Sequence, residues 1–303
     1  MSIQMSSSLQ FCIQQEIKKQ NLPDLFIETV TQWFFPIGEF IASKKQATQH
    51  PLVINVNGSQ GSGKSTLVSF LELLLEQHFS LATVSISIDD FYLTQLERKD
   101  LSEKIHPLLE TRGVPGTHDL DLACKTIKSL MNPKSGETIA IPRFDKAIDD
   151  RYPESEWLVV DKKVDVILFE GWCNHAPVES EENLINPIND LERTYDSDGK
   201  WRRYVNESLK SYHQELFCLS DFLIFLKIPS FNKVIEWRGL QEKKLANYNK
   251  QATSIMNKKR LAFFIQHYER ITKNCLKSLG EQADMVLEID DEHLIKSMYS
   301  HDG

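Results

Sequence analysis

The chain has 303 residues, of which 41% are hydrophobic, so it is long enough to bury a large core. Its formal net charge is -8 and its pI is about 5.6, which argues against a general nucleic-acid-binding protein, because such proteins present a basic face. The scattered cysteines include no C-x-x-C pair, which argues against a zinc site or a disulfide framework and favours reduced thiols. They are Cys12, Cys124, Cys173, Cys218 and Cys275.

The N-terminal part of the chain is predicted to be helical. Apolar residues recur at near-helical spacing within 8–45, so residues 1–49 are expected to form a helical extension that packs on the core. Residues 1–18 are polar and lack an apolar secretory core, and no run approaches the roughly 20 apolar residues of a membrane helix. We therefore expect a cytoplasmic protein without membrane contact.

A phosphate-binding loop follows the first predicted strand. The apolar run Val53–Val56 leads into the pattern G-x-x-x-x-G-K-S, after which a helix pattern continues to about His78. Its glycines let successive backbone N–H groups turn toward a phosphate, and the positive end of the helix faces the same anion. Lys64 is expected to reach the β- and γ-phosphates, and the Ser65 hydroxyl to ligate magnesium. The loop residues are Gly58, Ser59, Gln60, Gly61, Ser62, Gly63, Lys64, Ser65 and Thr66.

The remaining elements alternate between strands and helices. Strands are predicted at 81–88, 164–169, 221–228 and 283–289, and helices at 93–106, 119–131, 200–215, 230–248 and 253–279. This alternation predicts an α/β protein with the P-loop nucleoside triphosphate hydrolase fold, a mostly parallel sheet with helices on both faces. Short strands at 138–142 and 157–160 are expected to form a hairpin. The acidic stretch 176–199 is expected to be a loop insertion, either a repellent rim or a disordered surface loop.

Acidic residues end two of the predicted strands. Asp89 and Asp90 follow the strand at 81–88, and Glu170 follows the strand at 164–169. Ligands bind at the carboxyl ends of the strands in a parallel sheet, so these acids are expected close to the phosphate loop. Phosphoryl transfer to a hydroxyl uses a carboxylate for the acceptor proton, a role open to Asp89 or Asp90. Glu170 is the candidate second magnesium ligand.

Six motifs together resemble a known kinase group. GSQGSGKS at 58–65, IDDFY at 88–92 and FEGW at 169–172 resemble the phosphoribulokinase/uridine kinase/pantothenate kinase group. RGVPGTHD at 112–119, PRFDK with DR at 142–151, and WRGLQEKKL at 237–245 resemble the plant-type D-glycerate 3-kinases within that group. The resemblance extends from about residue 50 to 290. It implies a P-loop kinase domain over residues 50–303.

The resemblance also implies a role for each matching residue. Asp89 corresponds to the catalytic base, and Glu170 to the acid that helps to hold Mg²⁺. A lid at about 230–250 places Arg238 over the phosphates, so Asp89, Lys64 and Arg238 are the catalytic candidates. ATP is the implied donor, and D-glycerate, converted to 3-phosphoglycerate, is the best-supported acceptor.

A basic region is the candidate acceptor site. Glycerate and pantothenate each carry a carboxylate, which arginine grips in bidentate fashion, and Arg143 is the favoured residue for this contact. The full set of acceptor candidates is Asp90, Tyr92, Arg112, His118, Arg143 and Lys146. Trp172 and Trp237 either shape the pocket or lie in the core.

Two alternatives stay open from the sequence. One is a kinase for another small acceptor, such as uridine, pantothenate or a sugar phosphate. The other is a regulatory P-loop ATPase, although no N-K-x-D guanine signature is present. The partner is expected to be a small molecule rather than a nucleic acid, and the chain to be a monomer or a homodimer.

Overall fold

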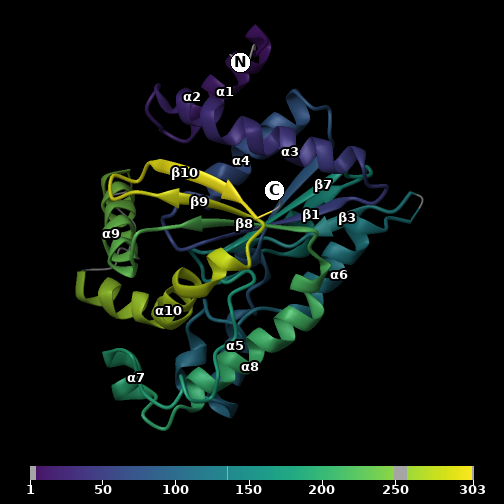
Figure 1. The fold of residues 1–303 in the computed structure, drawn as a ribbon. Helices are drawn as coiled ribbons and strands as arrows, with labels where there is room; N and C mark the ends of the chain where they lie inside the picture. Colours follow the sequence, from purple (N-terminus) through teal and green to yellow (C-terminus); the bar gives the residue numbers. More distant parts are fainter. Residues whose placement is uncertain (1–4, 135, 249–257, 302–303) are drawn as a thin grey trace.

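The centre of the molecule is a six-stranded sheet (Figure 1). A computed structural model of the chain describes residues 5–134, 136–248 and 258–301, where the strand order is β10-β9-β8-β1-β7-β2. Five strands run parallel and β10 runs antiparallel to β9, which confirms the predicted mostly parallel α/β fold. The strands are β1 Leu52–Gly58, β2 Thr83–Ser87, β7 Val166–Gly171, β8 Phe222–Lys227, β9 Met285–Ile289 and β10 Ile295–Ser300.

Helices cover both faces of the sheet (Figure 1). They are α1 Ser7–Lys19, α2 Phe26–Thr29, α3 Phe35–Gln46, α4 Lys64–Gln77, α5 Gln95–Lys104, α6 Leu120–Met131, α7 Asp190–Tyr195, α8 Lys200–Glu215, α9 Phe231–Tyr248 and α10 Lys258–Ser278. Ile54 and Val56 of β1 face the side covered by α1, α3 and α4. Val53 faces the side covered by α6, α8 and the later part of α10. Burial on both faces explains the apolar run at the start of β7, whereas the apolar residues of β1 are interrupted by the buried Asn55 and Asn57.

The connections contain short helical turns. The 3-10 helices are Ile88–Phe91, Pro107–Glu110, Glu154–Glu156, Phe217–Leu219 and Leu279–Glu281, and a π-helical turn spans Val30–Phe34. Thr94 begins α5 with a capping box, because its hydroxyl accepts a hydrogen bond from the Glu97 backbone while the Glu97 carboxylate accepts one from the Thr94 backbone.

The N-terminal helices share a core with the sheet. Phe70 of α4 is fully buried, with its ring centroid 5.5 Å from that of Phe26 and 6.0 Å from that of Phe34. A polar contact joins α4 to α1, because the Ser69 hydroxyl donates a hydrogen bond of 2.7 Å to Glu16. Residues before β1 therefore support the helix that follows the phosphate loop. The division of the chain at residues 49 and 50 stays a prediction.

Two small antiparallel hairpins lie outside the main sheet. β3 Ile139–Ile141 pairs with β6 Leu158–Val160, which confirms the predicted hairpin. Between them, β4 Phe144–Asp145 pairs with β5 Asp150–Arg151, a hairpin that the sequence did not indicate. This inner hairpin brings residues 143–151 to the loop after β2, because Phe144 N donates to Asp90.

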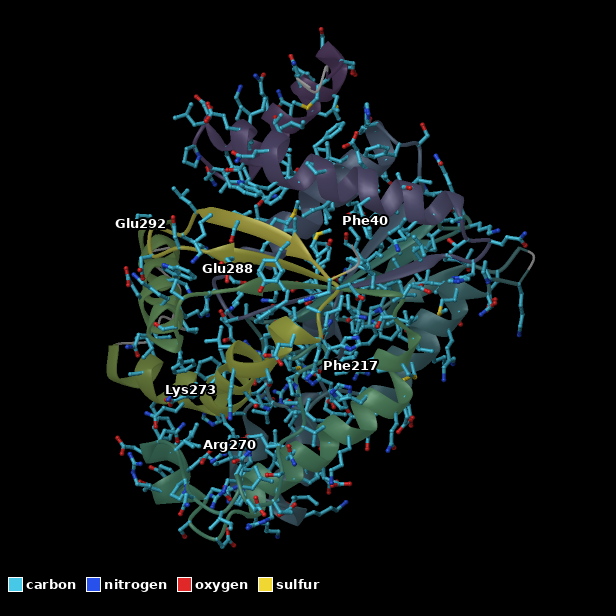
Figure 2. All side chains as sticks on the ribbon, viewed as in Figure 1. Phe40, Phe217, Arg270, Lys273, Glu288 and Glu292 are labelled. Atoms are coloured by element: carbon cyan, nitrogen blue, oxygen red, sulfur yellow. The ribbon has the colours of Figure 1, made fainter. Side chains whose placement is uncertain are left out.

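One expectation about the end of the chain was wrong: the final strand is β10 rather than the segment at 283–289, which forms β9 inside the sheet. Of the two interpretations left open for the stretch 176–199, the disordered loop does not hold, because the stretch contains α7 and is held by buried ion pairs. Arg270 of α10 is 8% exposed and donates to Glu192 at 2.6 Å, while Arg202 of α8 is 2% exposed and donates to Asp196 at 2.9 Å. Figure 2 shows Arg270 on α10, on the side of that helix toward α7.

Parts of two predictions lie outside the described residues. They are positions 249–250 of the predicted lid and the start of the helix predicted at 253–279. Within residues 5–134, 136–248 and 258–301, no helix combines the length and the apolar character that crossing a membrane requires.

Phe70→Ala is expected to lower the free energy of unfolding by about 3–5 kcal/mol, because it leaves a cavity among buried aromatic rings. Urea denaturation measures the change. Phe11→Ala is the matched control, since Phe11 of α1 is 61% exposed and its loss is expected to cost less than about 0.5 kcal/mol. Equal destabilisation by the two variants would contradict a shared core between α4 and the N-terminal helices.

Candidate active site

The phosphate loop connects β1 to α4 in the predicted way. Gly61 has φ +80° and Gly63 has φ +92°, both in the left-handed region that favours glycine. Gly63 directly precedes α4, so the N–H groups of the first helical turn face the loop. This cradle suits a phosphate, because backbone donors and the helix dipole act on the same anion.

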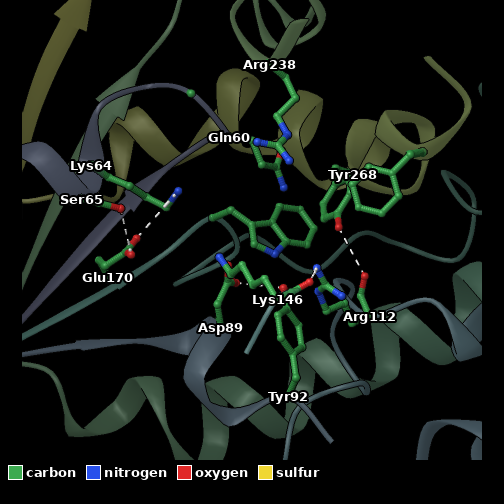
Figure 3. A pocket seen from close by; sticks show the side chains of 13 residues that line it. Gln60, Lys64, Ser65, Asp89, Tyr92, Arg112, Lys146, Glu170, Arg238 and Tyr268 are labelled. Atoms are coloured by element: carbon green, nitrogen blue, oxygen red, sulfur yellow. Dashed lines mark hydrogen bonds and ion pairs between the residues drawn. The ribbon is translucent and has the colours of Figure 1, made fainter. Parts of the chain in front are cut away.

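The loop residues divide between the cavity and the interior. Gln60, Gly61, Lys64 and Ser65 line a cavity at the carboxyl ends of the parallel strands (Figure 3). The other predicted loop residues lie behind or beside it. Ser59 and Ser62 are 6% and 3% exposed, Gly58 ends β1, and Thr66 belongs to the first turn of α4.

A carboxylate and a hydroxyl meet beside the loop. The Ser65 hydroxyl donates a hydrogen bond of 3.1 Å to Glu170 Oε1, and Lys64 Nζ lies 3.7 Å from Glu170 Oε2 (Figure 3). Glu170 is only 9% exposed, and no described residue donates a hydrogen bond to its Oε2. A buried carboxylate oxygen that accepts no hydrogen bond from the described residues, next to a hydroxyl, fits a divalent cation that prefers oxygen ligands.

The remaining metal ligands would come from elsewhere. Among the described residues, no group of three or more His, Cys, Asp or Glu side chains could hold a metal ion. A cation at Ser65 and Glu170 would therefore complete its coordination with phosphate oxygens and water, as Mg²⁺ does in nucleotide sites.

Asp89 lies on the other side of the cavity, in the 3-10 turn that follows β2. Its Oδ1 accepts a hydrogen bond of 2.8 Å from the Tyr92 hydroxyl, and its Oδ2 accepts one of 2.6 Å from Lys146. Burial raises the pKa of Asp89, but the Lys146 ammonium outweighs burial together with other cationic groups and lowers the pKa to about 2. Asp89 is therefore ionised at neutral pH.

Cations and aromatic rings complete the cavity. Arg112, Lys146 and Arg238 line it, and Arg238 projects from α9 over the loop (Figure 3). Trp172 also lines it while it is 3% exposed and packs in the core, so both roles left open for this residue apply. Its ring packs edge-on against Tyr268 at 4.8 Å, and the Tyr268 hydroxyl donates to Arg112 O at 3.3 Å.

Two aromatic residues of α10 were not predicted. Phe264 and Tyr268 line the cavity, but no motif marks them, and their spacing in sequence is that of core residues on an amphipathic helix. Trp237 is 4% exposed and packs beside Gly61, so it lies in the core directly behind the phosphate loop.

Three predicted acceptor residues lie outside this cavity. Asp90 and Arg143 form an ion pair of 2.7 Å and line an adjoining cavity, which shares Ser65 and Glu170 with the first. His118 is 5% exposed, and its ring stacks on Tyr92 at 4.5 Å. Burial lowers the pKa of His118 to about 4, so the imidazole is neutral at physiological pH. Tyr92, Arg112 and Lys146 are the predicted acceptor residues that the structure brings together with Asp89.

Comparison with known proteins gives the context of this site. No family model matches the chain. The uncharacterized kinase mug58 of Schizosaccharomyces pombe is 30% identical over 239 residues, which cover 76% of this chain and 83% of that protein. The chain belongs to the D-glycerate 3-kinase family. Within the family, the chloroplastic D-glycerate 3-kinase of Arabidopsis thaliana is 32% identical over 255 residues, 79% of this chain, although the match spans only 52% of that relative.

A solved structure shares the fold of this chain, and a more distant relative is also a kinase. A D-glycerate 3-kinase from Cryptococcus neoformans has a TM-score of 0.70 with 24% identity, covers 89% of this chain and 98% of its own, and shows the same P-loop kinase fold. The pantothenate kinase of Lactococcus lactis IL1403 is 23% identical over 82% of this chain and 72% of its own length. Members of the D-glycerate 3-kinase family are phosphotransferases that use ATP as donor and an alcohol group of a small molecule as acceptor. This chain is therefore an ATP-dependent small-molecule kinase.

Asp89→Asn is expected to lower kcat about 10²–10⁴-fold, because the amide cannot accept the acceptor proton. The Kd for ATP, measured by calorimetry, is expected to stay at the wild-type value, since Asp89 lies across the cavity from the phosphate loop. Asp90→Asn is the neighbouring control and is expected to retain most of kcat, because Asp90 faces Arg143. A kcat for Asp89→Asn within about 10-fold of wild type would exclude Asp89 as the general base.

Proposed function

We propose that this kinase transfers the γ-phosphoryl group of Mg²⁺-bound ATP to a hydroxyl of D-glycerate and forms 3-phosphoglycerate. The names of the Arabidopsis and Cryptococcus proteins support the choice of acceptor. The observation that carries the proposal is the grouping of an ionised carboxylate, Asp89, with two cations, Arg112 and Lys146, in the cavity that the phosphate loop enters. A small hydroxy acid offers a matching hydroxyl and carboxylate.

The reaction follows from these positions. The acceptor hydroxyl oxygen forms a bond to the γ-phosphorus, the bond to the β–γ bridging oxygen breaks, and ADP leaves with that electron pair. Asp89 takes the hydroxyl proton, while Lys64 and the N–H groups at the start of α4 hold the phosphates. Ser65 and Glu170 would hold Mg²⁺, which supplies neutralisation of phosphate charge. Arg238 of α9 acts from the lid side and adds positive charge over the phosphates.

Arg112 and Lys146 are the proposed contacts of the acceptor carboxylate. The Arg112 guanidinium lies against the Asp149 carboxylate and donates to Lys146 O at 3.3 Å, so it is held in place without closing the cavity. Arginine binds a carboxylate in bidentate geometry, whereas lysine contributes a mobile point charge. Arg143, the favoured residue from sequence, pairs with Asp90 in the adjoining cavity rather than in the cavity that contains Asp89.

The partner class, the location and the organisation of the chain are proposed from its charge, its cysteines and its sequence. The net charge of -8 supports action on a small molecule rather than on nucleic acid. Five free cysteines are consistent with a reducing cytoplasm. We propose a monomer or a homodimer, with residues 1–49 as an extension of the kinase domain at 50–303 and a lid at about 230–250.

Purified protein with ATP and Mg²⁺ is expected to convert D-glycerate to 3-phosphoglycerate, detected as product by mass spectrometry. Pantothenate and uridine serve as competing acceptors in the same assay, and both are expected to give lower kcat/KM. A preference for either of them would overturn the named acceptor while leaving the kinase assignment intact. Titration with EDTA is expected to abolish turnover, because Ser65 and Glu170 would lose their cation.

Arg112→Ala is expected to raise KM for D-glycerate at least about 10-fold, because a charge-assisted bidentate contact contributes roughly 1.5–3 kcal/mol. KM for ATP is expected to change much less. Arg143→Ala is the matched variant, since it removes the same side chain from the adjoining cavity, where it faces Asp90. If Arg143→Ala alone raises the acceptor KM, the carboxylate contact belongs to Arg143 and this assignment is wrong.

A further inference from the structure

Both carboxylate oxygens of the proposed base, Asp89, already have partners. Tyr92 donates to Oδ1 and Lys146 donates to Oδ2, at 2.8 and 2.6 Å. In Figure 3 the Lys146 side chain lies against Asp89 and toward the centre of the cavity. An acceptor hydroxyl must hydrogen-bond to Asp89 before it can give up its proton. Each carboxylate oxygen can accept a second hydrogen bond, but the Lys146 ammonium lies on the cavity side of Asp89 and lowers its basicity, so exchange of a contact is what frees Asp89 to act as a base.

The two contacts differ in how readily they can be exchanged. Tyr92 is 3% exposed, its ring stacks on His118 at 4.5 Å and meets Phe144 edge-on at 5.2 Å, so its hydroxyl is fixed. The Lys146 side chain is 61% exposed and ends in an ammonium on a flexible four-carbon stem. Exchange at Oδ2 therefore requires only a rotation of the lysine side chain, whereas exchange at Oδ1 requires repacking of buried rings.

The backbone that carries Lys146 is held by several contacts, whereas the exposed side chain is held by its ion pair with Asp89. Arg112 donates to Lys146 O at 3.3 Å, and the fully buried Arg98 donates to Asp149 O at 3.0 Å and to the Asp149 carboxylate at 2.7 Å. Asp145 accepts a 2.8 Å hydrogen bond from Ala147 N within the same turn. The ammonium is thus free to rotate within the cavity about a fixed Cα position.

We propose that Lys146 is a specificity-determining residue: its ammonium occupies Oδ2 of Asp89 until an anionic group of the acceptor draws it away. This inference rests on the proposed function, because it assigns the acceptor proton to Asp89. Binding of a hydroxy acid replaces one ion pair by another. Lys146 moves from Asp89 to the acceptor carboxylate, and the acceptor hydroxyl donates to the vacated Oδ2.

A neutral acceptor cannot make this exchange. It offers a hydroxyl to Asp89 but no anion to Lys146, so the ammonium would lose a charge-assisted hydrogen bond without replacement. Water is also neutral and cannot draw Lys146 away from Asp89. ATP is therefore protected from hydrolysis when no acceptor is bound. The carboxylate of the acceptor is then required for activation of the base, in addition to its contribution to binding.

The electrostatics of the pair agree with this scheme. Burial raises the pKa of Asp89, and Lys146 is the largest of the influences that lower it. Burial in turn lowers the pKa of Lys146, but the Asp89 carboxylate outweighs it and raises that pKa. Departure of Lys146 leaves burial as the dominant influence on Asp89, which makes the carboxylate a stronger base at the moment when the hydroxyl arrives.

The experiment compares D-glycerate with glycerol, which replaces the carboxylate by a neutral hydroxymethyl group. Lys146→Gln is expected to lower kcat/KM for D-glycerate and to raise kcat/KM for glycerol, each by roughly 10-fold, because glutamine offers Oδ2 only a neutral hydrogen bond that any hydroxyl can replace. Lys146→Arg keeps the charge and is expected to retain the preference for D-glycerate. A fall in kcat/KM for both acceptors, or no change for glycerol, would overturn the proposal.

Arg112→Gln is the control that separates binding from activation of the base. Arg112 lines the cavity but donates to Asp149 and to Lys146 O rather than to Asp89. Its replacement is expected to weaken D-glycerate without raising glycerol turnover. If Arg112→Gln raises glycerol turnover as much as Lys146→Gln does, the effect is a general change of cavity charge and the proposal fails.

Hydrolysis of ATP without any acceptor is the readout that does not depend on the acceptor's identity. Lys146→Gln is expected to increase this rate several-fold over wild type, and unchanged hydrolysis would count against the role of Lys146. Absence of D-glycerate turnover in the wild-type protein would instead reject the named acceptor, so the two failures are distinguishable. The Kd for ATP and the Tm of each variant verify that the fold is intact.

Discussion

The register between three parallel strands is the constraint on which the site depends. Glu170 at the end of β7 is paired with Val56 of β1 on one side and with Ser87 of β2 on the other. The phosphate loop leaves β1 two residues after Val56, and Asp89 follows Ser87 by two residues. Because a parallel ladder fixes these distances, the phosphate cradle, the candidate metal ligand and the candidate base meet at one edge of the sheet without any long-range adjustment.

Charge balance is the second organising property of the cavity. Lys64 faces Glu170, Lys146 faces Asp89, and Arg112 faces Asp149. In a partly buried site, each ion pair prevents an isolated charge, whose desolvation would be costly. Each pair can also be exchanged. Phosphate oxygens or an acceptor carboxylate can take the place of the acidic partner, and a metal ion can take the place of the cationic partner. The site is thus arranged for ions to replace ions, which suits a reaction between a polyanionic donor and an anionic acceptor.

The sequence predicted those parts of the molecule whose local residue pattern already reflects their surroundings in the folded protein. β7 and β8 are buried on both faces and contain apolar runs, and the phosphate loop after β1 has a motif set by backbone geometry. β10 was missed because I-K-S-M-Y-S is an edge strand with mixed polarity, paired only with β9. The inner cavity wall was missed because Phe264 and Tyr268 become lining residues only when α10 docks. Arg143 was predicted as the acceptor contact, but the structure places it in the adjoining cavity, and its pairing with Asp90 depends on the β4–β5 hairpin, which local sequence does not reveal.

The ion pair between Arg270 and Glu192 connects the surface stretch at 176–199 to the cavity through a single helix. Arg270 lies two positions from Tyr268 on α10, and its guanidinium also donates to the backbone carbonyls of Asn183 and Asn186. A change of length or sequence in that stretch is therefore expected to reposition the aromatic wall while the identity of every substrate-facing residue stays the same. For protein engineering, this makes the outer segment a remote means of reshaping the acceptor cavity, and natural divergence has the same route available.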